Sequence, residues 1–161
     1  MYDYSNIYKV TKRLDSMFAE RYNHDKEIVR KNRLELLVEL GELANETRCF
    51  KYWSKKQTGE KEKVLEEYID CLFMTLYFCN TNGISLDEEF PESLNGDVID
   101  TFMTLFKYAS SLKSKPNKET IKKILVELDH LAKLLSFTIE DLERITKTKN
   151  DIIEDRFNSE Y

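Results

Sequence analysis

The stretch VLEEYIDCLFMTLYFC, residues 64–79, decides the fold of this chain. Apolar side chains recur at helical spacing on nearly all of its sides: Leu65, Ile69, Leu72, Phe73, Met74, Leu76, Tyr77 and Phe78. Asp70 is the one charged residue between positions 68 and 79. A helix that is apolar almost all round is usually buried. We therefore expect a buried helix over residues 62–80.

Helical spacing of apolar residues continues through the rest of the chain, and strict alternation is nearly absent. Asn82-Gly83 indicates a left-handed helix end, while Asn117, and Thr138 with Asp141 three residues later, predict helix N-caps. We expect six helices, over residues 4–22, 28–47, 62–80, 97–113, 118–135 and from 138 to about 157. The 161 residues contain only four Gly and two Pro, which favours one all-α domain over residues 1–161, a helical bundle.

Composition restricts the class of protein. The net charge is −5, whereas nucleic-acid-binding modules usually carry a basic excess, so we expect no nucleic-acid partner. No run approaches the ~18 apolar residues of a membrane span and no signal peptide is indicated, so we expect no membrane association. Cys49, Cys71 and Cys79 are too irregularly spaced for a disulfide framework, which favours a reducing, cytoplasmic location.

Four glutamates lie along one face of the expected helix over residues 28–47. They are Glu35, Glu39, Glu42 and Glu46, spaced 4, 3 and 4 residues apart. At about 100° per residue they fall within about 60° of one another. Like charges at these spacings repel by a few tenths of a kcal/mol per pair. The stripe therefore indicates either a bound cation or an acidic surface that faces solvent.

The next helix carries a matching pair, Glu67 and Asp70, on one face. Asp70 has no Lys or Arg beside it in its apolar stretch, and a buried carboxylate without a partner costs several kcal/mol or loses its charge. A metal ion or a partner from another helix would stabilise it; hydrogen bonds from tyrosine or backbone groups are the alternative. We expect Glu39, Glu42, Glu67 and Asp70 to converge between antiparallel helices as an all-oxygen cluster, which favours Mg²⁺ or Mn²⁺ over zinc.

A di-iron carboxylate bundle would also place glutamates inside helices, but it needs Glu-x-x-His on two of them. The chain has one such match, Glu127 with His130, and its other histidine, His24, has no glutamate three residues before it. The pattern therefore argues against a di-iron centre, and we interpret His130 as a packing or surface histidine.

Two further features contain aromatic rings or cations. The string Phe50-Lys51-Tyr52-Trp53 suits a planar base and a phosphate, although such a short string is also typical of core packing. Lys149 and Arg156 are seven residues apart, hence about 20° apart on a continuous helix. They would either bind a polyphosphate together or form the solvated side of the last helix.

The segments ELLVELGELANETRCFKYW (residues 35–53) and VLEEYIDCLFMTLYF (residues 64–78) resemble the all-α dimeric dUTPases, members of the MazG-like nucleotide pyrophosphohydrolase superfamily. They contain Glu39-x-x-Glu42, Asn45, the FKYW string and Glu67-x-x-Asp70 in the order and spacing of that family. Lys149-Asn150, Arg156 and Tyr161 match its C-terminal pattern more loosely, and Leu14-Asp15 resembles its N-terminal motif. The resemblance covers essentially the whole chain.

The resemblance implies a homodimeric, Mg²⁺-dependent enzyme that hydrolyses dUTP to dUMP and pyrophosphate. In the family, four acids hold Mg²⁺ ions that bind the substrate phosphates and activate a water, and one of the glutamates acts as the base. Carried over by position, the resemblance implies catalytic and metal-binding roles for Glu39, Glu42, Glu67 and Asp70. It implies substrate-binding roles for Asp15, Asn45, Lys51, Trp53, Phe73, Lys149, Asn150, Arg156 and Tyr161.

The chain departs from the usual family pattern at three positions where base and sugar selection is expected: Thr11 stands in place of Gln, Phe73 in place of His and Ile153 in place of Asn. Two alternatives therefore stay open. One is a MazG-like enzyme with another substrate, such as dCTP or a damaged nucleotide. The other is a catalytically inactive helical protein that binds a partner through its acidic groove.

Overall fold

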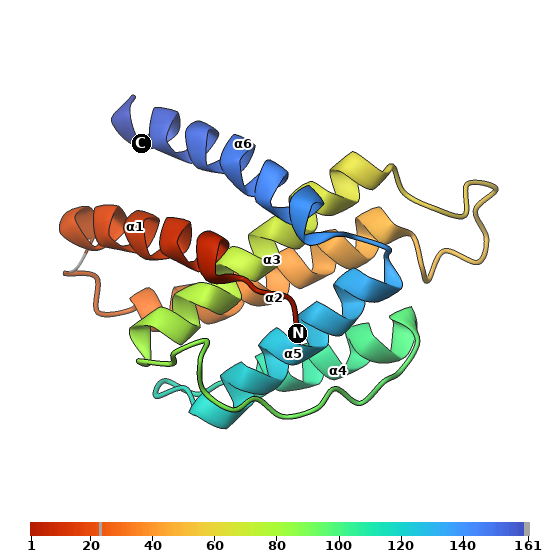
Figure 1. The fold of residues 1–161 in the computed structure, drawn as a ribbon, viewed down its shortest axis with the longest axis horizontal. Helices are drawn as coiled ribbons and strands as arrows, with labels where there is room; N and C mark the ends of the chain where they lie inside the picture. The colour runs from red at the N-terminus through yellow and green to blue at the C-terminus, as the bar shows by residue number, and fades with distance from the viewer. Residues whose placement is uncertain (23, 160–161) are drawn as a thin grey trace.

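The computed structural model describes residues 1–22 and 24–159, which form six helices and no strand. The helices are α1 (Ser5–Tyr22), α2 (Ile28–Thr47), α3 (Lys61–Thr81), α4 (Val98–Ser111), α5 (Lys118–Leu134) and α6 (Ile139–Asn158) (Figure 1). Every end lies within two residues of the end expected from the sequence. The all-α prediction is confirmed.

Helix α3 is the centre of the bundle. It packs against α1, α2, α5 and α6, and eleven of its 21 residues are buried. In Figure 1, α2 and α3 lie side by side, with the α4–α5 pair on one side of them and α1 and α6 on the other. The nearly continuous apolar surface of residues 64–79 therefore has a direct structural reason, since helices cover it from several directions.

Local signals fix the helix ends where the sequence indicates them. Gly83 has a φ of +63°, the left-handed conformation that glycine adopts without a steric penalty. The Asn117 side chain accepts a hydrogen bond from the Glu119 backbone N–H at 2.8 Å. Thr138 and Asp141 form a reciprocal capping box at the start of α6. All three predicted signals are confirmed.

The connector between α3 and α4 is held against α5. The buried Glu127 carboxylate accepts a hydrogen bond from the Leu94 N–H at 2.7 Å, and His130 Nε2 lies 2.8 Å from the Gly96 carbonyl oxygen. The Glu127/His130 pair thus has a packing role, as interpreted for His130 from the sequence. None of the helices among the described residues is long and apolar enough to cross a membrane.

Candidate active site

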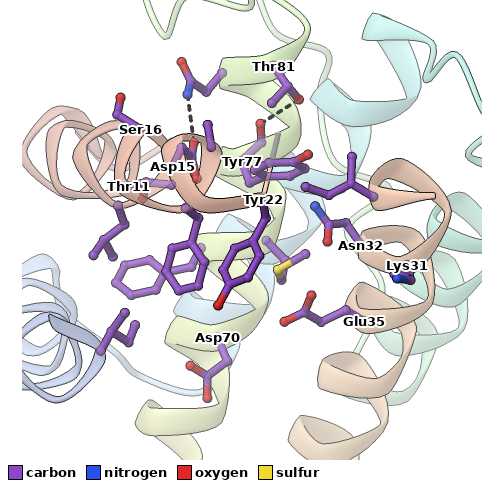
Figure 2. Close-up of a pocket in the computed structure, with 18 of the residues that line it drawn as sticks. Thr11, Asp15, Ser16, Tyr22, Lys31, Asn32, Glu35, Asp70, Tyr77 and Thr81 are labelled. Atoms are coloured by element: carbon purple, nitrogen blue, oxygen red, sulfur yellow. Dashed lines mark hydrogen bonds between the residues drawn. The ribbon is translucent and has the colours of Figure 1, made fainter. Parts of the chain in front are cut away.

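A cleft of about 720 Å³ opens between α1, α2 and α3, and α6 contributes one residue to its wall (Figure 2). Its lining contains residues from the acidic stripe, from the apolar stretch of α3 and from the N-terminal helix. Among them are Thr11, Asp15, Asn32, Glu35, Glu39, Asp70, Phe73, Met74, Tyr77, Asn80 and Ile153. A cleft of this volume is large enough for a nucleotide.

Three carboxylates come together at one end of the cleft. One oxygen each from Glu39 on α2 and from Glu67 and Asp70 on α3 lie within 4.8 Å of one another. All three side chains are partly buried, and Glu39 and Asp70 line the cleft itself. We call these three residues the acidic floor. It exists because α2 and α3 pack side by side, so that their acidic faces meet.

Glu42 lies beside the acidic floor rather than within it. Its side chain is exposed, yet its negative charge raises the pKa of Glu39, Glu67 and Asp70. The pKa of Glu39 reaches about 7, first because burial disfavours the charged form and then because of the charges on Asp70 and Glu42. The pKa values of Asp70 and Glu67 are raised as well, with burial again the largest cause.

Lys149 supplies the partner for Asp70 that the third helix lacks in its own sequence. Its ammonium group on α6 forms an ion pair with the Asp70 carboxylate. This cation lowers the pKa values of Asp70 and Glu67, but burial still raises both above their usual range. Of the means of stabilising Asp70 considered from the sequence, the structure thus contains the partner from another helix.

A second part of the cleft is formed by Thr11, Asp15, Phe73, Asn80 and Ile153, which we call the upper cleft. Thr11 and Phe73 are buried, and the other three are half-buried. Asn80 donates a hydrogen bond from Nδ2 to Asp15 Oδ2 at 2.8 Å. The positions 11, 73 and 153, which the sequence comparison associates with base and sugar selection, therefore line one cavity together with Asp15.

The FKYW string lies outside the cleft. It occupies the loop between α2 and α3, and it is not core packing, because Tyr52 is 90% and Trp53 64% exposed. Lys51 is half-buried, and Asn45 is exposed in the last turn of α2. None of these residues lines the cleft described above. In a single copy of the chain, Asn45, Lys51 and Trp53 therefore lie outside the cleft that Glu39 and Asp70 line.

Asn150 and Arg156 lie on the side of α6 that faces α1. Asn150 is buried and accepts a hydrogen bond from Arg13 at 2.7 Å. Arg156 is exposed and lines a smaller cavity of about 470 Å³, which shares Phe18, Tyr22 and Ile153 with the main cleft. Tyr161 lies outside the described residues.

Several polar residues of the cleft have no role predicted from the sequence, among them Asn32, Glu35, Tyr77 and Asn80. Glu35 belongs to the acidic stripe, and although its side chain as a whole is exposed, its carboxyl group lies among protein atoms. This partial burial and the charge on Asp70 raise its pKa. The stripe contained a signal for Glu35, but nothing in the sequence distinguishes Asn32, Tyr77 or Asn80 from ordinary helix residues.

A family model described as dUTPase matches residues 3–161, nearly the full chain. No curated protein matches the chain.

Proposed function

The chain belongs to the dUTPase family, and from this we propose that its cleft hydrolyses dUTP to dUMP and pyrophosphate with a divalent cation bound at the acidic floor. Family membership identifies the chain as a nucleoside triphosphate pyrophosphohydrolase of the dUTP diphosphatase type. The observation that carries the proposal is the convergence of Glu39, Glu67 and Asp70, whose oxygens lie within 4.8 Å of one another in a nucleotide-sized cleft.

The acidic floor fits a hard divalent cation. Its donor atoms are all carboxylate oxygens, the ligands that Mg²⁺ and Mn²⁺ prefer over the nitrogen and sulfur ligands of zinc. The raised pKa values of Glu39, Glu67 and Asp70 show that each carboxylate is destabilised by burial and by its acidic neighbours. A cation held by these oxygens would reverse that effect, since a positive charge within a few ångströms favours the ionised form. We propose Mg²⁺ as the physiological ion and Mn²⁺ as a substitute.

The protein's own groups would then carry out the remaining steps. A bound divalent cation supplies positive charge for the phosphate oxygens and lowers the pKa of a water. Glu42 is exposed beside the acidic floor, so it is the glutamate best placed to accept the proton of the attacking water. The water attacks a phosphorus of the triphosphate in line with the leaving oxygen, and the bond to the leaving phosphate breaks as the new bond forms.

Cations from α6 would bind the triphosphate. Lys149 already contacts the acidic floor through Asp70, so a small rotation of its side chain would direct its ammonium group at a phosphate. Arg156 lies seven residues later on the same continuous helix, roughly 10 Å further along its axis. We assign Asn45, Asn150, Lys51, Trp53 and Tyr161 to substrate binding on the strength of the family pattern alone.

A nucleotide panel tests this function. Phosphate release should be measured for each common dNTP with a coupled pyrophosphatase, with Mg²⁺, with Mn²⁺ and with EDTA. We expect Mg²⁺-dependent turnover of dUTP that EDTA abolishes. Turnover of a different nucleotide, but not of dUTP, would support the same metal-dependent hydrolysis with another substrate. Thr11, Phe73 and Ile153 are the residues that suggest this alternative. An absence of turnover on the whole panel would contradict the proposal.

The family resemblance also implies a homodimer, and the structure offers a surface for it. Helices α2 and α4 pack together, and each exposes a pair of large apolar side chains four residues apart: Leu34 and Val38 on α2, Ile99 and Met103 on α4. Burial of these side chains against a second copy would be favourable. Light scattering should give the mass of a dimer for the wild-type protein, and Leu34→Lys with Met103→Lys should reduce it to that of a monomer.

A further inference from the structure

The Asp15–Asn80 pair is the most unusual polar feature of the upper cleft. Asp15 lies on α1 and Asn80 in the last turn of α3, and a hydrogen bond of 2.8 Å joins their side chains. Burial raises the pKa of Asp15 to about 6, while the hydrogen bond from Asn80 partly opposes this shift. At neutral pH the carboxyl group is therefore mostly ionised, although its surroundings disfavour the charge.

Three hydroxyl groups near this pair donate their protons elsewhere. Thr11 donates to the Ile7 carbonyl at 3.1 Å, Ser16 to the Lys12 carbonyl at 3.0 Å and Thr81 to the Tyr77 carbonyl at 2.9 Å. These bonds run back along the helices that carry the hydroxyl groups. Although Thr11, Ser16 and Thr81 line the cleft, they present acceptor lone pairs to a ligand rather than donated protons.

An ionised carboxylate accepts hydrogen bonds and donates none, and its two oxygens offer about four acceptor positions. Asn80 uses one of these on Oδ2. A ligand N–H or O–H group that reaches the other positions would satisfy a partly buried charge, whereas a ligand carbonyl at that place would be repelled. Sites built in this way discriminate strongly against analogues that lack the hydrogen-bonding group, because a buried polar group is then left unpaired.

Asn80 also decides where the carboxylate points. An aspartate on a helix can adopt several side-chain rotamers, and a hydrogen bond from a neighbouring helix selects one of them. Asn80 belongs to α3, the helix that also carries Asp70 and Phe73. Its hydrogen bond therefore fixes the Asp15 carboxylate relative to the other residues of the cleft. Figure 2 shows Asp15 above Asp70, with the aromatic rings of the cleft between them.

We propose that Asn80 is a positioning residue, which fixes the Asp15 carboxylate as the acceptor for a ring N–H or a sugar hydroxyl of the bound nucleoside and so contributes to substrate selection. This inference rests on the function proposed above, since it concerns the nucleoside end of the same cleft. It adds a residue that neither the motifs nor the family pattern singled out.

The test uses the full-length protein without added metal and three probes: deoxyuridine, its N3-methyl derivative and its 3′-deoxy derivative. Calorimetry or NMR titration gives their affinities for wild-type protein, Asn80→Leu and Asn80→Ser. We expect one of the derivatives to bind wild-type protein about tenfold more weakly than deoxyuridine, which corresponds to the loss of one hydrogen bond to a charged group. A loss with the N3-methyl compound assigns Asp15 to the base, and a loss with the 3′-deoxy compound assigns it to the sugar.

The variants separate positioning from stability. In Asn80→Leu the difference between deoxyuridine and the weaker derivative should fall below about threefold, and KM for dUTP should rise about tenfold with kcat within about twofold. Asn80→Ser, whose hydroxyl is too short to reach Asp15, should behave in the same way with less disturbance of packing. Asn82→Leu is the matched control, because Asn82 also donates a side-chain hydrogen bond, to the Phe78 carbonyl at 2.8 Å, and does not line the cleft.

Three outcomes would overturn the proposal: equal binding of all three probes to wild-type protein, no binding of any probe, or unchanged discrimination in both Asn80 variants. Turnover of dUTP by wild-type protein is measured in parallel. If turnover is present and discrimination is absent, the positioning role fails while the proposed function stands. If no nucleotide is turned over, the proposed function fails, and the binding data still report on Asn80 independently.

Discussion

The acidic floor and the upper cleft are two parts of one cavity, yet they are built in different ways. The acidic floor comes from two helices that are neighbours in sequence, and its two members on α3, Glu67 and Asp70, are three residues apart. The upper cleft combines two residues of α1, two of α3 and one of α6, which lie up to 142 positions apart, from Thr11 to Ile153. Its walls combine polar and apolar side chains, and its one charged group, Asp15, accepts a hydrogen bond from Asn80.

In the function proposed above, this difference corresponds to a division of roles between the two parts of the cleft. Binding a divalent cation requires several charges at short range, so the acidic floor tolerates strong repulsion and raised pKa values. Distinguishing one nucleoside from another requires shape and a few directed hydrogen bonds, so the upper cleft needs few charges. Variants at the acidic floor should therefore affect the rate of hydrolysis, and variants in the upper cleft should affect which nucleotide binds.

The largest expected effect is at the acidic floor. Asp70→Asn should lower kcat by about 10³-fold or more, because loss of a metal ligand removes several kcal/mol of charge stabilisation in the transition state. Steady-state assays with saturating Mg²⁺ and dUTP measure this, and circular dichroism should show unchanged helix content. Glu66→Gln is the control, since Glu66 is an exposed acid of the same helix outside the acidic floor. Equal activities of wild type and Asp70→Asn would refute the metal site.

A smaller effect is expected from the cation beside the floor. Lys149→Met should lower kcat/KM about 10- to 100-fold through loss of a phosphate contact. It should also lower the melting temperature of the metal-free protein by a few degrees, because Asp70 would then lie among acids without its ion pair. Lys147→Met, an exposed lysine two residues earlier on α6, should leave both quantities unchanged. Equal effects of Lys149→Met and Lys147→Met on kcat/KM and on the melting temperature would contradict the role of Lys149.

The pH dependence of stability should reflect both ends of the cleft. In the folded protein Glu39 has a pKa of about 7 and Asp15 of about 6, against reference values of 4.5 and 3.8. The folded state therefore binds protons that the unfolded chain has already released. Their stabilisation is fully present below the reference values and is lost as pH rises through 6 and 7.

Melting temperatures in EDTA should accordingly fall between pH 5 and pH 8, and Glu39→Gln should flatten the upper part of that curve. The increase in melting temperature caused by added Mg²⁺ should grow as pH rises, because protons and the cation compete for the same carboxylate oxygens. A metal-free melting temperature that rises over this range would contradict the assigned pKa shifts.

The smallest effect is expected at Thr11 in the upper cleft. Its hydroxyl proton is donated to the Ile7 carbonyl, so Thr11→Val, which keeps the shape of the side chain, should change KM for dUTP by less than about twofold. The free energy of unfolding should change by less than about 1 kcal/mol. A KM increase above about fivefold would show that the Thr11 hydroxyl turns to the ligand, and the role of this wall would need revision.

The fold could be read from the sequence almost to the residue, because helix caps and helical periodicity are local signals. Residues such as Asn117, Thr138 and Gly83 act through their immediate neighbours. Glu39, Glu67 and Asp70 could be predicted as a group for a related reason, since consecutive antiparallel helices bring matching faces together. The position of the FKYW string could not be predicted in this way, because an aromatic string on a loop has the same local pattern whether it is buried or exposed.

Thus the sequence by itself determined six helices, the buried position of α3 and the acids of the cleft floor, each through residues a few positions apart on one helix or on adjacent helices. Only the tertiary structure decided that Lys149 pairs with Asp70, that Asn80 holds Asp15, and that Thr11, Phe73 and Ile153 share a wall. These contacts join residues 62 or more positions apart, between helices whose relative rotation depends on packing of the whole core. Side-chain spacing along one helix contains no information on that rotation, so the contacts appear only once the bundle is assembled.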